Sequence, residues 1–142
     1  MVFPYTHPTI TEFPIKGVIT LCGSVRFRKQ FDEVAAELCF NRWIALSLQI
    51  WGTEEKTGYI DDNNPLKELL EEMHRQKIAI GEAIIVINVG GYYGKSTTKE
   101  IEYARSIGRR IIWLEWKPDN MTLLKDMSYR EFNEVYNNYG KI

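Results

Sequence analysis

Short, unbroken apolar runs recur along the chain, separated by longer and more polar segments. Runs rich in Val, Ile and Leu predict β-strands at residues 17–21, 43–50, 83–89 and 110–116. The run at 83–89, Ala-Ile-Ile-Val-Ile-Asn-Val, is apolar on both faces. A strand that is covered on both sides in the middle of a parallel sheet has this composition.

The segments between these runs carry apolar residues at helical spacing. They predict helices over residues 25–41, 65–81, 97–107 and 128–139. Ser24 and Ser128 precede the first and last helices as candidate N-caps, and Pro65 opens the second helix at a position that favours proline. One face of that second helix collects large apolar residues: Leu66, Leu69, Leu70, Met73 and Ile80.

The alternation of strands and helices predicts an α/β fold, a single-domain Rossmann- or flavodoxin-like parallel sheet flanked by helices on both faces. Residues 17–142 form this domain, and residues 1–16, which hold three of the five prolines, form an N-terminal arm. Ligands of such sheets bind at the carboxyl ends of the strands. Candidate chemistry is therefore expected at two strand-to-helix junctions, residues 21–26 and 94–100.

Composition and charge narrow the range of partners. With 142 residues, 44% of them apolar, the chain is long enough to bury one core. The 18 basic and 19 acidic residues nearly balance, which argues against a nucleic acid polymer or an anionic membrane surface as partner. No apolar run approaches a membrane span, and Cys22 and Cys39 lack the spacing of a disulfide scaffold or a zinc site. We expect a cytoplasmic protein.

The first junction reads Leu-Cys-Gly-Ser-Val-Arg over residues 21–26. A glycine turn lets the backbone approach a ligand, and the free N–H groups of the following helix favour an anion such as phosphate. Gly23, Ser24, Val25 and Arg26 are therefore candidate ligand contacts. From spacing alone an equally good interpretation is that Ser24 only caps the helix and Arg26 points to solvent.

The second junction, Gly94-Lys95-Ser96-Thr97, invites comparison with the phosphate loop of nucleoside triphosphatases. That motif needs a glycine five residues before Gly94, where this chain has Val89. We therefore reject a triphosphatase. Ser96, Thr97 and the helix N-terminus still suit a ribose or a single phosphate.

Glu100 lies in the first turn after this junction and faces the expected crevice. Its carboxylate can serve there as nucleophile, base or acceptor for a sugar hydroxyl; the alternative is a glutamate that only complements the helix dipole. Tyr92 is core or interface material by default, but it flanks the crevice and can stack on a base. His74 is expected on the surface or at an interface, and without a well-spaced ligand set we assign neither a metal nor a cofactor.

Together the two junctions resemble a known family. The run Leu-Cys-Gly-Ser-Val-Arg and the pattern Ser-Thr-x-x-Glu-Ile-x-x-Ala over residues 96–104 are similar to motifs of the nucleoside 2-deoxyribosyltransferase superfamily. The resemblance spans residues 18–114, and its first motif is closest to the 2'-deoxynucleoside 5'-phosphate N-hydrolases. It implies a homodimer or a higher homo-oligomer.

The resemblance also implies roles for individual residues. Glu100 matches the family's nucleophilic glutamate, which attacks the sugar C1' and forms a glycosyl-enzyme. Gly23, Ser24, Val25 and Arg26 match the glycine–serine turn that contacts the nucleotide. Further candidate substrate contacts are Asn88, Tyr92, Gly94, Ser96 and Thr97.

Two acidic residues expected from the family are missing. Asn88 and Val89 end the strand where the transferases have an acid, and residues 73–77 supply no carboxylate. The remaining candidates for protonating the leaving base are Asp61, Asp62 and His74.

Three functions follow, in order of preference. The first is an N-glycosidase that cleaves the base–sugar bond of a nucleoside or deoxynucleoside 5'-monophosphate through a glycosyl-enzyme. The second is a deoxyribosyltransferase that exchanges bases. The third is a non-catalytic nucleotide-binding or sequestering module. In each case the partner is a small nucleoside or nucleotide, and no cofactor is required.

Overall fold

The structure is a computed structural model that describes residues 14–49 and 65–117. Its strands are β1 (Gly17–Gly23), β2 (Trp43–Leu46), β3 (Ala83–Val89) and β4 (Arg110–Trp116). Its helices are the short 3-10 helix η2 (Val25–Phe27), α1 (Arg28–Phe40), α2 (Pro65–Ile80) and α3 (Lys95–Ser106). Most of the expected arm, the loop at 51–64 and the expected helix at 128–139 lie outside the described residues.

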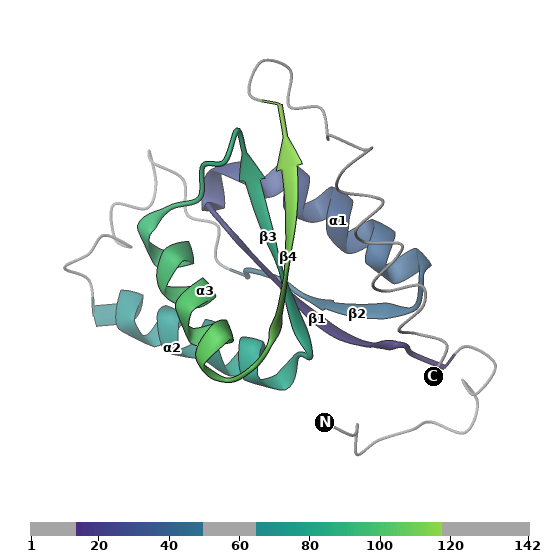
Figure 1. The fold of residues 1–142 in the computed structure, drawn as a ribbon, viewed down its shortest axis with the longest axis horizontal. Coiled ribbons are helices and arrows are strands. Elements are labelled where there is room, and N and C mark those ends of the chain that lie inside the picture. Colours follow the sequence, from purple (N-terminus) through teal and green to yellow (C-terminus); the bar gives the residue numbers. More distant parts are fainter. Residues whose placement is uncertain (1–13, 50–64, 118–142) are drawn as a thin grey trace.

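The four strands form one parallel sheet in the order β2-β1-β3-β4. Helix α1 covers one face of the sheet, and α2 and α3 cover the other (Figure 1). The α/β fold with helices on both faces is thereby confirmed. None of the helices in the described part of the chain is long and apolar enough to cross a bilayer.

Side-chain alternation along the central strands supplies a core on each face, because successive residues of a strand point to opposite sides. On the α1 face, Leu21 and Ile85 belong to one buried cluster with Phe31 of the helix. On the other face, Val86 belongs to a second cluster with Ile101 of α3. The central strand β3 is therefore apolar on both sides, as its composition predicts.

Several element boundaries differ from the sequence prediction, three of them near the site. The first helix does not begin at residue 25, because the Ser24 hydroxyl accepts a hydrogen bond from the Arg26 amide (3.3 Å) and caps the separate turn η2. The second strand ends at Leu46 rather than residue 50, and the carbonyl of the next residue, Ser47, accepts a hydrogen bond from Lys77 of α2 (2.8 Å). Helix α3 begins two residues before the expected position, at Lys95.

The expected apolar face of α2 does not pack on the core. Leu66, Leu69 and Met73 are each half exposed, whereas His74 and Ile78 are buried against α3 and the sheet. His74, which the sequence placed on the surface or at an interface, is thus buried between elements of the same chain. Helical spacing of leucines shows that residues share a face, but it does not show which face a neighbouring element covers.

The chain reverses its direction of travel across the sheet between β1 and β3. From β1 it moves outward to β2, and from β2 it crosses back to β3 on the other side of β1. Ligands of open α/β sheets bind at such a switch point, outside the carboxyl ends of the strands. Here the switch point lies between Gly23, at the end of β1, and Val89, at the end of β3.

Candidate functional site

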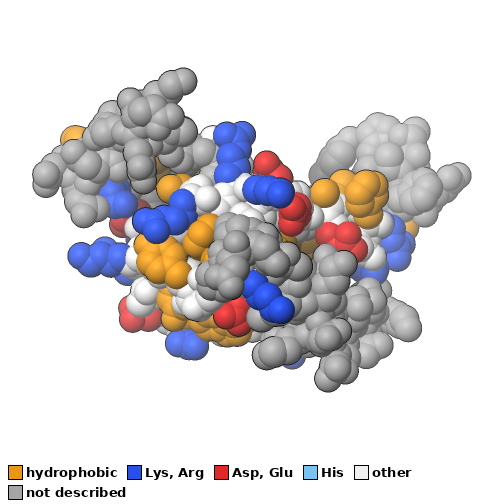
Figure 2. Space-filling view, turned by 90° about the horizontal axis from the view of Figure 1, so that it is seen from above, with side chains coloured by type: hydrophobic (Ala, Val, Ile, Leu, Met, Phe, Trp, Pro, Cys, Tyr) orange, Lys and Arg blue, Asp and Glu red, His pale blue; other side chains and the backbone are white. Residues whose placement is uncertain are grey.

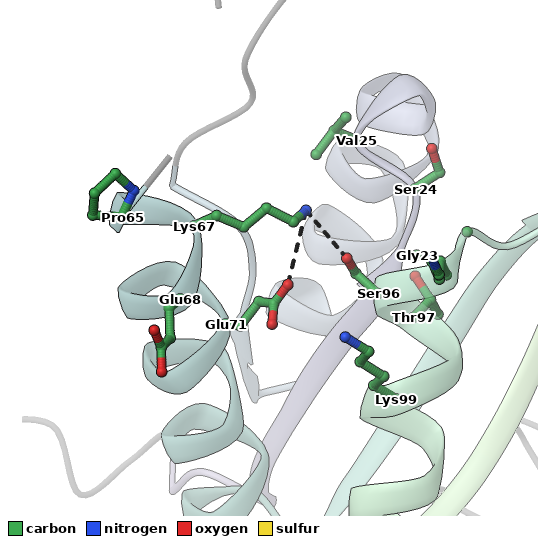
Figure 3. Close-up of a pocket in the computed structure, with 12 residues that line it drawn as sticks. Gly23, Ser24, Val25, Pro65, Lys67, Glu68, Glu71, Ser96, Thr97 and Lys99 are labelled. Atoms are coloured by element: carbon green, nitrogen blue, oxygen red, sulfur yellow. Dashed lines mark hydrogen bonds and ion pairs between the residues drawn. The ribbon is translucent and has the colours of Figure 1, made fainter. Parts of the chain in front are cut away.

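A cavity of about 730 Å³ opens at the carboxyl end of β1, between the first turns of α2 and α3 (Figure 3). This volume lies in the range of small-molecule sites. Three segments line the cavity, namely the first junction, α2 and the second junction. Their lining residues are Gly23, Ser24, Val25, Pro65, Lys67, Glu68, Glu71, Gly94, Lys95, Ser96, Thr97 and Lys99.

The structure brings most of the predicted contacts together here. Both junctions contribute, although they are about 70 residues apart in sequence. The predicted contacts that line this cavity are Gly23, Ser24, Val25, Gly94, Ser96 and Thr97. Arg26, Tyr92 and Asn88 are not among its lining residues, and Glu100 lies in an adjoining recess.

Arg26 and Tyr92 contact each other instead of the cavity. The Arg26 guanidinium lies 4.8 Å from the centre of the Tyr92 ring, in a cation–π arrangement. Phe27 meets the same ring edge to face, with 6.1 Å between ring centres. These contacts join the loop after β1 to the loop after β3, so Tyr92 serves here as a bridge between the two junctions.

Asn88 is a buried connector at the end of β3. Its side-chain amide donates a hydrogen bond to the Leu114 carbonyl of β4 (3.0 Å), and its side-chain oxygen accepts one from the Gly91 amide (3.0 Å). Gly90 and Gly91 both have positive φ angles, 59° and 85°. Asn88 thus holds the tight turn that leads toward α3.

Glu100 projects from α3 into a small recess beside the cavity. The recess is lined by Glu71, Arg75, Ser96, Lys99 and Glu100, and three of these residues also line the cavity. The Glu100 side chain is only 15% exposed. Its carboxyl group is therefore held largely out of water, at a point that a ligand in the cavity can approach.

Cys22 of β1 and His74 of α2 lie behind this carboxyl group. His74 Nε2 is 3.8 Å from Glu100 Oε2 and 3.5 Å from Cys22 Sγ. The donor atoms of the three residues all lie within 4.8 Å of one another. Residues from three elements, of which Cys22 and His74 are 52 positions apart in sequence, therefore form one buried polar cluster, which we call the Cys–His–Glu cluster.

Burial sets the protonation of this cluster. Burial raises the pKa of Glu100 to about 8, and the neighbouring Glu71 carboxylate raises it further. The Cys22 thiol and the cations Lys67 and Arg75 act in the opposite direction. Burial and repulsion by Lys77 lower the pKa of His74 to about 4. Burial also raises the pKa of the Cys22 thiol, with Glu100 acting in the same direction. At neutral pH these shifts favour the uncharged form of all three side chains.

Positive charge reaches the cavity from α2 and α3. Lys67 Nζ donates a hydrogen bond to Ser96 Oγ (3.4 Å) and lies 3.8 Å from a Glu71 carboxylate oxygen. Lys67 and Lys99 extend from opposite helices into the space between them (Figure 3). On the face that Figure 2 shows, Lys and Arg side chains are interspersed with acidic and apolar side chains. The arrangement suits one anionic group better than a polyanion.

Sequence reasoning missed the contribution of α2 to this site. Lys67, Glu71 and His74 follow one another at the i, i+4 and i+7 positions of one helical face, which is the signal that could have found them. The large apolar residues on the adjacent face concealed it. Asp61 and Asp62, the other candidate proton donors, lie outside the described residues.

No protein-family model and no curated protein matches this sequence. Solved structures match the fold. A 2-deoxyribosyltransferase from Bacillus psychrosaccharolyticus superposes with a TM-score of 0.54, at 12% identity over 72% of this chain and 74% of that chain. A 2-deoxyribosyltransferase from Leishmania mexicana superposes with a TM-score of 0.51, at 14% identity over 75% of this chain and 77% of that chain. The CMP N-glycosidase BcmB from Clostridium botulinum superposes with a TM-score of 0.45, at 16% identity over 84% of this chain and 83% of that chain. The chain thus shares the α/β fold of the two deoxyribosyltransferases.

Proposed function

We propose that this protein is an N-glycosidase that cleaves the base–sugar bond of a nucleoside or deoxynucleoside 5'-monophosphate, with Glu100 as the nucleophile. The observation that carries the proposal is the position of Glu100. Its carboxyl group is 15% exposed in a recess that adjoins a nucleotide-sized cavity at the switch point of the sheet. The shared fold with 2-deoxyribosyltransferases supports the same assignment.

The reaction proceeds by two displacements at C1'. The ionised Glu100 carboxylate attacks C1', the C1'–N bond breaks, and its electron pair leaves with the base. Water then attacks C1', releases the sugar phosphate and frees the carboxylate. Positive charge that develops on the sugar favours the ionised carboxylate, and Lys67 and Arg75 act on the pKa of Glu100 in the same direction.

Glu71 is the candidate acid for the leaving base. It lines both the cavity and the recess of Glu100, so a ligand that spans the two spaces lies beside both carboxyl groups. Glu71 takes up the proton that Glu100 releases, passes it to the base as the C1'–N bond breaks, and recovers a proton from the attacking water. This assignment replaces His74, which is buried behind Glu100 and faces Cys22.

The 5'-phosphate is assigned to the first turn of α3. Backbone N–H groups at the start of a helix and the serine and threonine hydroxyls there favour a phosphate. Lys67 and Lys99 add positive charge at the same place, because both line the cavity next to Ser96. Ser24 remains a candidate contact from the opposite side, whereas Arg26 is held by Tyr92.

Base exchange is the second candidate, favoured by the fold shared with the two deoxyribosyltransferases. It differs from hydrolysis only in the acceptor, because a second base replaces water in the second displacement. We further propose that the enzyme acts in the cytoplasm as a homodimer or a higher homo-oligomer, and that it needs no cofactor.

Incubation with a panel of nucleoside monophosphates, followed by chromatography of the free base, tests the proposal. We expect base release by the unaltered protein and a loss of more than about 10³-fold in Glu100→Gln, the order of loss that follows removal of a nucleophile. The matched control is Glu102→Gln, because Glu102 is exposed on the same helix. A parallel incubation with a second free base distinguishes transfer from hydrolysis.

Glu71→Gln tests the proton donor against Glu72→Gln, its exposed neighbour on α2. We expect a loss of base-release activity of about 10²–10⁴-fold in Glu71→Gln, largest for substrates whose base is a poor leaving group.

Base release that persists unchanged in Glu100→Gln contradicts the assigned nucleophile. Tight nucleotide binding without base release or exchange would instead assign the non-catalytic function.

A further inference from the structure

The Cys–His–Glu cluster has more donor capacity than the proposed reaction uses. Cys22 Sγ, His74 Nε2 and a Glu100 carboxylate oxygen lie within 4.8 Å of one another. Cys22 is fully buried, His74 is 3% exposed and the Glu100 side chain is 15% exposed. A thiol, an imidazole and a carboxyl group are thus directed toward one small volume inside the protein.

The geometry of the cluster differs from that of a catalytic relay. In a relay the histidine contacts the nucleophile through one ring nitrogen and the carboxylate through the other. Here Cys22 Sγ (3.5 Å) and Glu100 Oε2 (3.8 Å) both approach the same nitrogen, Nε2 of His74. Nδ1 of His74 has no hydrogen-bond partner among the described residues. The three donors therefore converge on a point rather than form a chain.

Convergence of this kind fits a tetrahedral metal ion. Zinc is bound by sulfur at about 2.3 Å, by histidine nitrogen at about 2.0–2.1 Å and by carboxylate oxygen at about 2.0–2.2 Å, so neighbouring donors around it are separated by roughly 3.3–3.6 Å. The separations of 3.5 Å for Cys22–His74 and 3.8 Å for His74–Glu100 lie close to these values. Small side-chain shifts would complete the coordination.

We propose that Cys22, His74 and Glu100 form a binding site for Zn²⁺. Thiolate and imidazole ligands select zinc over the hard cations Mg²⁺ and Ca²⁺. Binding requires the Cys22 thiol to lose its proton to solvent. Three protein ligands leave a fourth position open for a water or an anion. The small recess that adjoins Glu100 is the side from which an ion would approach the cluster.

Zinc at this site would inhibit base release. This second part of the inference rests on the proposed function, because it needs Glu100 to be the nucleophile. A carboxylate oxygen that coordinates Zn²⁺ is not available to attack C1'. The same residues then serve either as a metal site or as a glycosidase site, and the metal-free protein is the active form.

Metal binding is tested on the full chain without any substrate. The reduced, EDTA-treated and desalted protein is titrated with Zn²⁺ by calorimetry, and with Co²⁺ while the near-ultraviolet spectrum is recorded. We expect one equivalent of either metal and a thiolate-to-cobalt charge-transfer band that Zn²⁺ abolishes by displacement. Absence of saturable one-to-one binding overturns the proposal.

Cys22→Ser and its matched control Cys39→Ser identify the thiol, because Cys39 is the exposed cysteine of α1. We expect Cys22→Ser to lose the cobalt band and to bind Zn²⁺ more than about 100-fold more weakly, since even outer-shell changes cost about 10–100-fold. Cys39→Ser should match the unaltered protein. A band that survives in Cys22→Ser, or disappears in Cys39→Ser, overturns the assignment.

Glu100→Gln keeps the test decisive if Cys22→Ser fails to fold. This variant should keep the cobalt–thiolate band but bind Zn²⁺ at least about tenfold more weakly; unchanged affinity excludes Glu100 as a ligand and overturns the three-residue site. Base release is measured separately, in EDTA and with added Zn²⁺. Zinc binding without base release in EDTA refutes the glycosidase alone, and base release without zinc binding refutes the metal site alone.

Discussion

Gly23, the last residue of β1, pairs with Ile87, which lies two residues before the end of β3. Its φ angle is +156°, and a Cβ atom added there would lie 2.7 Å from the Ile87 carbonyl oxygen and 3.1 Å from the Phe31 ring. Because the nearest atom belongs to the backbone, the clash cannot be relieved by a rotamer change. We expect Gly23→Ala to lower the free energy of unfolding by about 1–3 kcal/mol, measured by urea denaturation.

Gly94→Ala provides the comparison for this prediction. Gly94 lies at the second junction and has an ordinary φ of −68°, and its nearest heavy atom to an added Cβ is the Tyr92 hydroxyl at 3.9 Å. Alanine is a somewhat poorer N-cap than glycine, so a smaller loss is expected. Equal losses in the two variants would show that steric exclusion at Gly23 is not the cause.

Glu100 also makes stability depend on pH. In the folded protein its pKa is about 8, against an ordinary value of 4.5, so the folded state holds this proton over a range in which the unfolded state has released it. Raising the pH therefore favours unfolding. His74, with its pKa lowered from 6.5 to about 4, has the opposite effect, but only below about pH 6.5.

Between pH 6.5 and 8 the effect of Glu100 on the free energy of unfolding is not offset by His74. We expect the free energy of unfolding of the metal-free protein to fall by about 2 kcal/mol across this window, at 1.36 kcal/mol per pH unit for one proton. Glu100→Gln should remove this part of the slope, whereas the exposed Glu102→Gln should leave it unchanged. Denaturation curves at several pH values in EDTA provide the measurement, and identical slopes in all three proteins would contradict the shifted pKa.

At the scale of elements, α2 presents two apolar faces with different roles. Ile78 is completely buried, whereas Leu69 is 53% exposed. We expect Ile78→Ala to cost about 2–5 kcal/mol of unfolding free energy and Leu69→Gln to change it by less than about 0.5 kcal/mol. Thermal and urea denaturation of the two variants compare the faces. A large loss in Leu69→Gln would show that this face is covered in solution.

The strands could be predicted well from sequence, because an apolar run that must be buried on both sides leaves few alternatives. The bounds of β3 and β4 agree with the apolar runs, and β1 extends two residues further. Helix orientation could not be predicted in the same way. The face of α2 that packs is chosen by α3 and the sheet, so His74 and Ile78 are buried although leucines are more numerous on the neighbouring face.

The candidate site, too, could be predicted from sequence only in part. The two junctions were predictable because glycines and hydroxyl residues directly follow apolar strands, and Glu100 follows one helical turn later. The contribution of α2 could not be predicted, because Cys22 and His74 are 52 positions apart and no local sequence pattern connects them. Arg26 illustrates a further limit, because the aromatic ring that holds it comes from a different junction.

At the scale of the whole molecule, ligand binding should stabilise the fold. A nucleoside monophosphate present at 100 times its Kd would raise the free energy of unfolding by about 2.7 kcal/mol, provided that it binds only the folded state. Thermal denaturation should show a higher Tm with the monophosphate than with the same concentration of its nucleoside. Lys67→Ala should reduce this difference, whereas Lys29→Ala, exposed on α1 at the opposite face of the sheet, should not. Equal shifts for nucleoside and monophosphate would contradict the phosphate assignment.

The strand order also has a consequence for folding during synthesis on the ribosome. β1 pairs with β2 at Gly17↔Trp43 and with β3 at Ile19↔Ala83, and the two partners begin 40 residues apart in the sequence. At a synthesis rate of about 5–20 residues per second, the second partner follows the first by roughly 2–8 s. During that interval the inner edge of β1 has no strand beside it, and the second junction, which lines one side of the cavity, has not been made. An unpaired strand edge is prone to aggregation, so the nascent chain is exposed to that risk before the cavity can form.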